Sequence, residues 1–440
     1  MSSKEKYTRL AHAGPGTDAG EVLRRYWQPV ALTEELDGPR PVKAVQLMGE
    51  HLVLFRCSDT YRLANRACPH RGVDLAYGRL EKNGLRCLFH GWLFDGLGNC
   101  LEQPAEPAES DGYTRAKHVA YPCLERNGII FAYLGPGEAP PLPELDCFTA
   151  PTEQVFSYKG LWHCNWLQAL EVGIDPAHAS FLHRFFEDDS LDEAYGRQFR
   201  DEAADSNVSL TKVLREFERP EIKIEKTDYG FRLITLRELD EQNTHVRVTN
   251  MLFPNAIVIP MSKEMVIAQW HVPIDEHTCY WYSMFVSFAD PVDKEIMRAQ
   301  RIDMNPPPDY KPKYGPHNQW GYNSEEQKSH TYTGMGDDIN VHDQWAVESP
   351  GPIVDRSMQR LGRSDVGIIH YRRMLTRTMD AILNGENTIP MSDAENIKTI
   401  RGPVAIDEIA PADQWQHCWK ERDLRRRNAS GWATDPWKEQ

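Results

Sequence analysis

The sequence lacks any apolar run long enough to cross a bilayer, which takes about 20 consecutive apolar residues. Its most apolar stretches, GIIFAYLG at 128–135 and AIVIPM at 256–261, are far shorter. The amino terminus, MSSKEKYTRL, is polar, and no apolar core of a signal peptide follows it. These absences argue against a membrane-spanning or secreted protein, and we expect a cytoplasmic one.

The sequence also lacks an excess of positive charge. It contains 50 Lys and Arg residues against 65 Asp and Glu residues, for a formal net charge of −15. Nucleic acids and anionic membranes require a basic surface, so this charge argues against both as partners. The one basic run, at 420–430, mixes signs and indicates either a solvated helix face or a crossing contact. The acidic run at 185–193 indicates a solvated loop or a lid.

A complete glycine-rich dinucleotide fingerprint is missing as well. The nearest approach, DGLGNC at 95–100, falls in an expected β-hairpin rather than before a helix, and so indicates a turn. We therefore expect no nicotinamide or flavin site in this chain. The nine cysteines would be reduced in the cytoplasm unless they ligate metal, so disulfides explain them poorly.

What the sequence does contain predicts an α+β protein. Its 440 residues are enough for two or three domains with hydrophobic cores. Short β-branched and aromatic runs broken by Gly, Asn and Asp predict antiparallel strands, and a Pro/Gly-rich stretch predicts a linker. Strands followed by helices, without βαβ alternation, favour α+β. The expected parts are strands at 43–135, a linker at 135–145, helix at 161–184, strands at 210–290, and an amphipathic helix at 364–384 capped by Gly385.

The first candidate metal site combines two cysteines and two histidines. Its members are Cys68, His70, Cys87 and His90, with sixteen residues between the two pairs. They could bind one tetrahedral zinc ion, or a [2Fe–2S] cluster with two cysteines on one iron and two histidines on the other. The glycines at 72, 84 and 91 favour the cluster, because they let backbone amides approach its bridging sulfides.

A second polar cluster lies in EVGIDPAHASFLHR, residues 171–184. On a regular helix Glu171, Asp175 and His178 fall within about 60° of one another, whereas His183 lies roughly 140° from His178. Two readings remain open at this point. Either the stretch is an amphipathic helix with a polar face and His183 is no ligand, or the helix ends or widens between the histidines and both bind a metal.

Both clusters resemble motifs of one family. The Cys/His pairs, followed by G-W-x-F-D, resemble the Rieske signature over residues 66–96. Residues 165–183, NWLQALEVGIDPAHASFLH, resemble the N-W-x4-E-x3-D-x2-H-x4-H motif of Rieske non-haem iron oxygenases. The resemblance implies that His178 and His183 bind a mononuclear Fe(II). It also implies that Asp175 passes electrons from the Rieske histidine of a neighbouring subunit, and it can hold the His178 ring.

Two histidines need a carboxylate to complete a facial triad on iron. Residues 339–375 resemble the carboxy-terminal segment of the phthalate dioxygenase-like branch, in which the ligand position matches Asp343. We expect the adjacent His342 to lie on the opposite face of a strand, with a structural role. The rival carboxylates are Asp337, Asp338 and Asp355.

The resemblance also implies the domains and partners. It predicts a Rieske [2Fe–2S] domain at 1–150, a helix-grip antiparallel-sheet catalytic domain with mononuclear iron at 151–402, and a tail at 403–440. Because the two centres within one chain of the family are too distant, a head-to-tail homotrimer is expected. A separate NAD(P)H-dependent reductase or ferredoxin would supply the electrons.

The substrate is indicated less directly. Arg247 looks like a carboxylate-binding arginine of phthalate dioxygenase, although a surface strand position explains it equally well. Residues 181–200 resemble the dehydrodivanillate O-demethylase group, which implies O-demethylation of a methoxylated lignin-derived biaryl acid. The alternatives are cis-dihydroxylation of phthalate or a related aromatic carboxylate, a zinc-binding structural protein, and a pure electron carrier.

Overall fold

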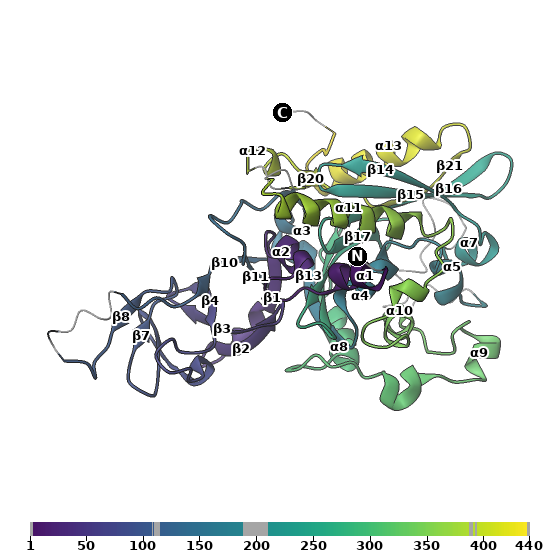
Figure 1. Ribbon diagram of the computed structural model, residues 1–440. Coiled ribbons are helices and arrows are strands. Elements are labelled where there is room, and N and C mark those ends of the chain that lie inside the picture. The colour runs from purple at the N-terminus through teal and green to yellow at the C-terminus, as the bar shows by residue number, and fades with distance from the viewer. Residues whose placement is uncertain are drawn as a thin grey trace.

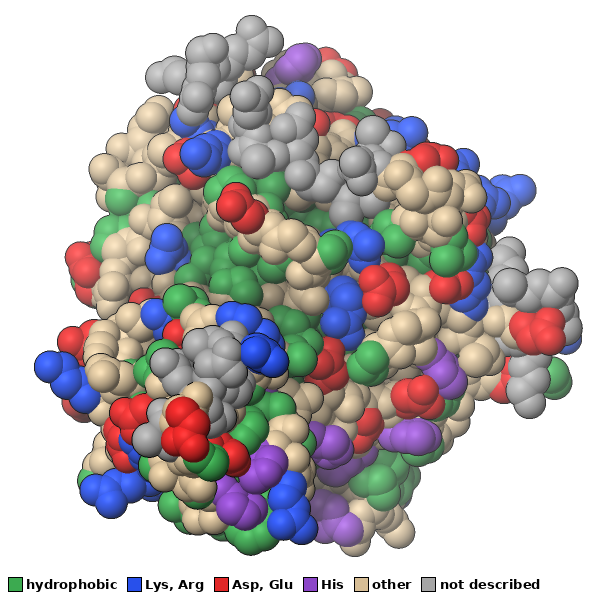
Figure 2. Space-filling model, turned by 60° about the vertical axis from the view of Figure 1, so that its left-hand side comes forward, with side chains coloured by type: hydrophobic (Ala, Val, Ile, Leu, Met, Phe, Trp, Pro, Cys, Tyr) green, Lys and Arg blue, Asp and Glu red, His purple; other side chains and the backbone are tan. Residues whose placement is uncertain are grey.

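A computed structural model describes residues 3–107, 109, 115–187, 210–386, 390–391 and 394–437. Its strand-rich smaller part projects from a larger part built of one extended sheet and its covering helices (Figure 1). Much of the acidic run at 185–193 and most of the stretch at 181–200 lie outside the described residues. On the described part of the face in Figure 2, acidic, basic and apolar side chains are interspersed.

The smaller part contains three antiparallel sheets, as the strand pattern at 43–135 predicts. The first has the order β2 (Val42–Leu47), β3 (Glu50–Cys57), β4 (Thr60–Asn65), β9 (Ala120–Tyr121). The second has the order β5 (Arg79–Glu81), β6 (Gly84–Arg86), β7 (Leu93–Phe94), β8 (Cys100–Glu102). The third has the order β1 (Gln28–Leu32), β11 (Ile129–Ala132), β10 (Cys123–Arg126). Asn127 and Gly128, with φ of 46° and 88°, join β10 to β11 as residues that tolerate positive φ.

The larger part is organised around an eight-stranded antiparallel sheet. Its strands, in spatial order, are β13 (Val155–Trp162), β19 (Cys279–Ser287), β18 (Met265–Pro273), β17 (Ala256–Pro260), β16 (Asn243–Leu252), β15 (Gly230–Glu238) and β14 (Glu221–Thr227), with β21 (Ile406–Pro411) also paired to β16. In addition, β12 (Glu144–Leu145) pairs in parallel with β20 (Arg401–Gly402). The α+β class and the antiparallel sheets are thereby confirmed.

Helices cover this sheet and its ends (Figure 1). The described helices are α1 (Ser3–Ala11), α2 (Asp18–Leu23), α3 (Asp146–Thr149), α4 (Trp166–Gly173), α5 (Ala179–Leu182), α7 (Leu210–Glu216), α8 (Lys294–Met304), α9 (Glu326–Ser329), α10 (Ile339–Glu348), α11 (Val366–Leu383), α12 (Ala394–Ile397) and α13 (Trp415–Ser430). The helix expected at 364–384 is confirmed as α11, which Gly385 follows at a φ of 73°. The helical character expected at 161–184 is confirmed in part, because β13 runs to Trp162 and the two separate helices α4 and α5 follow.

The hydrophobic core is divided in a way that separates the two candidate metal sites. One large cluster joins α1, α2, β1 and β11 to the eight-stranded sheet, and Phe131 of β11 packs edge-on against Trp270 of β18. A second, smaller cluster surrounds Cys68 and Cys87 within the smaller part. The cysteine loops therefore have a core of their own, and the third sheet anchors that part to the larger one.

Residues 403–437 are built into the larger part, whereas the sequence led us to expect a tail. Strand β21 is hydrogen-bonded to β16, and α13 packs over it. Within α13 the side chains of Arg426 and Arg427 are 2% and 1% exposed, so these members of the basic run do not form a solvated face. Arg427 instead makes a bidentate ion pair with Asp146 of α3, with two distances of 2.7 Å, and contacts Asp423 at 2.6 Å. The structure therefore supports the second interpretation of the basic run, in which its arginines contact another part of the fold.

We expect Asp146→Ala to lower the free energy of unfolding by about 3–5 kcal/mol, because it leaves the Arg427 guanidinium buried without its bidentate partner. Urea unfolding followed by circular dichroism measures this loss. Glu325→Ala is the matched control, since its ion pair with Lys328 is exposed and contributes little. Equal unfolding midpoints for the two variants would contradict the assigned role of the buried pair.

Candidate metal centres and catalytic cavity

The two Cys/His loops of the smaller part have the same backbone geometry. In each loop a glycine at φ 75° donates its N–H to the carbonyl of the cysteine that begins the loop, Gly72 to Cys68 at 2.8 Å and Gly91 to Cys87 at 3.0 Å. Both turns need a positive φ that glycine adopts without strain. Glycine is required at position 84 for a different reason, because a Cβ there would lie 2.0 Å from the Phe94 carbonyl oxygen of β7. Sheet packing therefore explains Gly84, which the sequence had suggested belongs to the cluster.

These loops bring the four candidate ligands together. The two cysteines are buried, whereas the rings of His70 and His90 are partly exposed and have centroids 4.5 Å apart. Trp92 stacks on His70 with a centroid distance of 4.4 Å and an interplanar angle of 4°. Burial, with a contribution from the neighbouring Cys87, raises the pKa of Cys68 to about 11. Two buried cysteines could hold one iron and two half-exposed imidazoles the other, from which electrons could pass outward, so the donor set fits a [2Fe–2S] cluster.

In the larger part, three side chains from two segments converge. His178 precedes α5, His183 follows it, and Asp343 lies on α10. The two Nε2 atoms are 3.2 Å apart, and Asp343 Oδ1 lies 3.2 Å from His183 Nε2 and 3.6 Å from His178 Nε2. A search of the described residues for three or more His, Cys, Asp or Glu side chains with ligand atoms within 4.8 Å of one another finds these three.

The break between α4 and α5 is what makes this convergence possible. Asn165 caps α4 by accepting from the N–H of Leu167, and it donates to the carbonyls of Ala11 and Glu276 at 3.0 and 2.9 Å. Helix α4 ends at Gly173, three residues before Pro176, whose ring disfavours helical backbone at the residue before it. The 140° separation of the two histidines holds for a regular helix only, so it does not apply here.

The three side chains fit a metal ion with facial coordination. With metal–nitrogen bonds of about 2.1 Å, two ligands at a right angle are about 3.0 Å apart, close to the separation of the two Nε2 atoms. Burial, together with the positive charge of Arg247, lowers the pKa of His183 to about 3, so its ring is neutral. Burial raises the pKa of Asp343 to about 6. A cation bound between the three side chains would favour the ionised form of this carboxylate.

Asp175 holds the first histidine through its backbone. The Nδ1 of His178 donates to the Asp175 carbonyl, which directs Nε2 toward the other two ligands. The Asp175 carboxylate lies 4.0 Å from Nδ1 and accepts instead from the N–H of Ala177 at 2.9 Å. The ring contact that we expected is therefore made by the main chain. The carboxylate is 22% exposed, and Asp175 also lines the cavity described below.

The rival carboxylates and His342 have other partners. Asp338 caps α10 and pairs with Arg301 at 2.6 Å, and Asp337 lies 2.6 Å from His330. Asp355 caps a 3-10 turn. His342 lies on the helix α10, so the strand that we expected there is wrong, but its ring is buried behind His183 and its Nε2 lies 2.8 Å from the Gly336 carbonyl.

Glu171 of the same motif is structural. It accepts two hydrogen bonds from Arg372 of α11, at 2.6 and 2.8 Å, and lies 3.5 Å from Arg356. All three side chains are almost completely buried. Glu171 therefore ties α4 to α11 and fixes the helix from which the ligand segment emerges.

A cavity opens beside the three convergent side chains. Its lining is mostly apolar and aromatic, as in small-molecule sites. The residues are Trp162, Val172, Gly173, Asp175, Pro176, His178, Ala179, His183, Leu214, Arg247, Thr249, Ile257, Ile259, Met261, Ile267, Gln269, His271, Trp281, Ile339, Asn340 and Asp343. The motifs visible in the sequence account for only some of them, since sheet residues such as Trp162, Gln269 and Trp281 carry no motif.

Arg247 lines this cavity, so it is not a surface strand residue. Its guanidinium pairs with Asp407 of β21 and donates to the Pro260 carbonyl at 2.9 Å. Asp407 also lies 3.0 Å from the ring of His245. Sequence reasoning missed Asp407 because no motif marks it, and it comes from the segment that we expected to be a tail.

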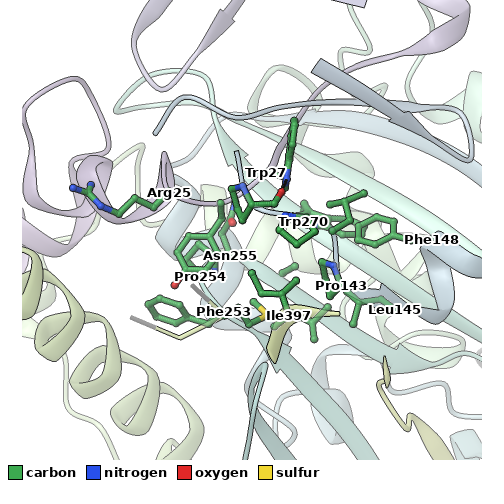
Figure 3. A pocket seen from close by; sticks show the side chains of 17 residues that line it. Arg25, Trp27, Pro143, Leu145, Phe148, Phe253, Pro254, Asn255, Trp270 and Ile397 are labelled. Carbon is green, nitrogen blue, oxygen red and sulfur yellow. Dashed lines mark hydrogen bonds between the residues drawn. The ribbon is translucent and has the colours of Figure 1, made fainter. Parts of the chain in front are cut away.

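A second cavity lies between the linker and the larger part (Figure 3). Its labelled side chains are mainly aromatic, aliphatic and proline, and the Arg25 side chain extends away from them (Figure 3). Among the described residues, no convergent group of metal-binding side chains lines it. The cavity beside His178, His183 and Asp343 is therefore the candidate catalytic site.

Comparisons with known proteins agree with both centres. Residues 26–122 match the Rieske [2Fe-2S] domain, and residues 132–423 match the LigXa C-terminal domain like family. The chain therefore belongs to the Rieske non-haem iron oxygenases, oxidoreductases with a Rieske cluster and a mononuclear iron, and both cofactors are confirmed at that level. It is a terminal oxygenase component.

Within that family, the chain is similar to oxygenase subunits of aromatic acid metabolism. It is 34% identical to the phthalate 4,5-dioxygenase oxygenase subunit of Pseudomonas putida, over 88% of this chain and 89% of that one. It is also 34% identical to the 5,5'-dehydrodivanillate O-demethylase oxygenase subunit of Sphingobium sp., over 88% and 82%.

Solved structures support the fold. NdmA of Pseudomonas putida CBB5 with caffeine is 19% identical, with a TM-score of 0.57 over 87% of this chain and 97% of that one. An oxygenase and ferredoxin complex of carbazole 1,9a-dioxygenase is 20% identical, with a TM-score of 0.54 over 84% and 95%. Among the described residues, no helix is at once long and apolar enough to cross a membrane.

Proposed function

We propose that this terminal oxygenase O-demethylates a methoxylated, lignin-derived aromatic acid of the biaryl type. The observation that carries the proposal is the convergence of His178, His183 and Asp343 at the edge of a largely apolar cavity. We assign these three side chains as the ligands of the mononuclear iron, and Cys68, His70, Cys87 and His90 as those of the cluster. The similarity to the dehydrodivanillate enzyme supports the substrate class.

The protein's own residues would bind and orient the substrate. Iron held by the three ligands would supply the activation of O₂ for insertion into a C–H bond. The apolar sheet face would hold the aromatic rings and limit the entry of water, and Arg247 at the wall would attract the substrate carboxylate, although Asp407 already offsets part of its charge. Oxygenation of the methoxy carbon gives a hemiacetal, which collapses to a phenol and formaldehyde. The second oxygen atom leaves as water, with two electrons from the reductase and two protons.

We propose that the electrons come from a separate reductase or ferredoxin and cross between subunits. Asp175 supports this route, because its main chain holds the ring of His178 and its carboxylate is partly exposed. A head-to-tail homotrimer would place a neighbour's Rieske histidine beside it. The solved complex of a related oxygenase with ferredoxin is consistent with a separate electron donor.

Product analysis tests the proposed reaction. The purified oxygenase, given a surrogate reductase and a methoxylated biaryl acid, is expected to release formaldehyde in proportion to the O₂ consumed. The second candidate is cis-dihydroxylation of phthalate or a related acid, which the 34% identity to the phthalate enzyme favours, and it gives a dihydrodiol without formaldehyde. Neither product across both substrate families would overturn the assigned substrate class. Iron and acid-labile sulfide, measured in the same sample, separate this family assignment from a zinc protein.

A further inference from the structure

Two neutral polar side chains in the catalytic cavity have no hydrogen-bond partner in the described part of the chain. His271 on β18 is 1% exposed, and neither of its ring nitrogens is hydrogen-bonded. Gln269, two residues earlier on the same strand, is 9% exposed and makes no side-chain hydrogen bond. Both line the cavity. A buried polar group without a partner is unfavourable, so the His271 ring calls for an external partner, and the neighbouring Gln269 amide can bind the same group.

The sheet places this pair on one side of the cavity and Arg247 on the other. Alternate residues of a strand share a face, and the facing residues of β18 include Gln269 and His271. The neighbouring strand β17 contributes Ile257 and Ile259, and β16, the next strand, contributes Arg247. Two strand spacings separate β18 from β16, or about 10 Å. An apolar strip therefore lies between a cationic edge and a neutral polar edge.

The surroundings of His271 restrict what can bind there. Its ring lies 5.6 Å from that of Trp162 and pairs in the sheet with Trp281, so only a small group can approach it. Burial lowers its pKa to about 3, which leaves a neutral ring with one donor and one acceptor. Gln269 likewise offers one acceptor and a donor without charge. A phenolic hydroxyl matches these groups, because it is a single oxygen that both donates and accepts.

We infer that His271 and Gln269 form a subsite for a phenolic hydroxyl of the aromatic substrate, across the ring from the carboxylate at Arg247. The inference rests on the proposed function for its aromatic acid and adds the second recognised substituent. It assigns His271 as a specificity-determining residue that binds substrate and takes no part in metal binding.

Equilibrium binding without O₂ tests this subsite independently of turnover. The two probes are 4-hydroxy-3-methoxybenzoic acid and 3-methoxybenzoic acid, which differ only in the phenolic hydroxyl. We expect the iron-loaded enzyme to bind the hydroxylated acid about 10- to 100-fold more tightly, as calorimetry or quenching of tryptophan fluorescence would show. In His271→Phe the ratio is expected to fall to about one, because phenylalanine fills the space and offers no hydrogen bond.

Two further variants keep the test decisive. His271→Gln restores a donor and an acceptor and is expected to recover part of the preference. His277→Phe, in the exposed turn between β18 and β19, is the control and should keep the full ratio. An unchanged content of mononuclear iron and an unchanged circular dichroism spectrum show that each variant is folded. A ratio near one in the unaltered enzyme, an unchanged ratio in His271→Phe, or no binding of either acid at millimolar concentration would overturn the inference. Failure of formaldehyde release would count against the proposed demethylation alone.

Discussion

Asp343→Ala is expected to abolish turnover and to release the mononuclear iron, while the absorbance of the [2Fe–2S] cluster stays unchanged. Asp343 supplies the oxygen that lies 3.2 Å from His183 Nε2 and 3.6 Å from His178 Nε2, so its removal leaves two neutral imidazoles. A divalent ion then loses the anionic ligand of the triad. The cluster belongs to a separate hydrophobic core, which the substitution does not touch.

Metal analysis with a sulfide assay gives the measurement, and we expect iron per chain to fall from about three atoms to about two. Turnover should decrease by at least 100-fold, since even changes beyond the direct ligands cost metal sites about 10- to 100-fold. Asp337→Ala is the control, because this nearby carboxylate lies against His330 and does not reach the triad. Equal iron contents in the two variants would remove Asp343 from the ligand set.

Asp175→Asn is expected to reduce turnover by about 100-fold or more with both metal centres still in place. Asparagine keeps the oxygen that accepts from the Ala177 N–H, and the backbone carbonyl still holds His178. What disappears is the negative charge of a partly exposed side chain at the expected crossing between subunits. The loss therefore falls on electron transfer and leaves metal binding intact.

Stopped-flow absorbance distinguishes a loss of electron transfer from a loss of metal binding. In the unaltered enzyme with substrate and O₂, the reduced cluster should reoxidise rapidly, whereas in Asp175→Asn it should stay reduced. Asp355→Asn is the matched control, since Asp355 caps its turn by the same contact two residues along the chain and is not among the three convergent side chains. Full activity in Asp175→Asn would exclude the bridging role, and loss of iron would reassign Asp175 to the support of the metal site.

The motif residues differ in how far their roles could be predicted. The paired spacing of Cys68, His70, Cys87 and His90 predicted two short loops with one pair each, and the folded structure brings the two loops together. Glu171 looked like part of the polar face of a metal site, yet it binds Arg372 of α11. That partner lies 201 residues away in the chain, and no local pattern marks it.

The residues around the candidate iron site were also only partly predictable from the sequence. The i, i+5 spacing of His178 and His183 could not decide between a continuous helix and an interrupted one, and the interruption after Gly173 resolved it. Asp343 was assigned through a resemblance and was expected on a strand, although it lies on α10. The sequence did not decide whether Arg247 lies at the surface or in a cavity, and the place of β16 within the sheet decided it.

The resemblance of two local motifs to a known family indicated the class of protein. Local spacing and composition indicated the cluster loops and the α+β architecture, because these depend on residues close together in the chain. Tertiary structure alone decided which polar groups face the cavity and which partners they already have. Asp407 compensates Arg247, and His271 is left without a partner among the described residues, because strands distant in sequence meet in one sheet. Such pairings follow from the register and packing of the whole sheet, which no single segment specifies.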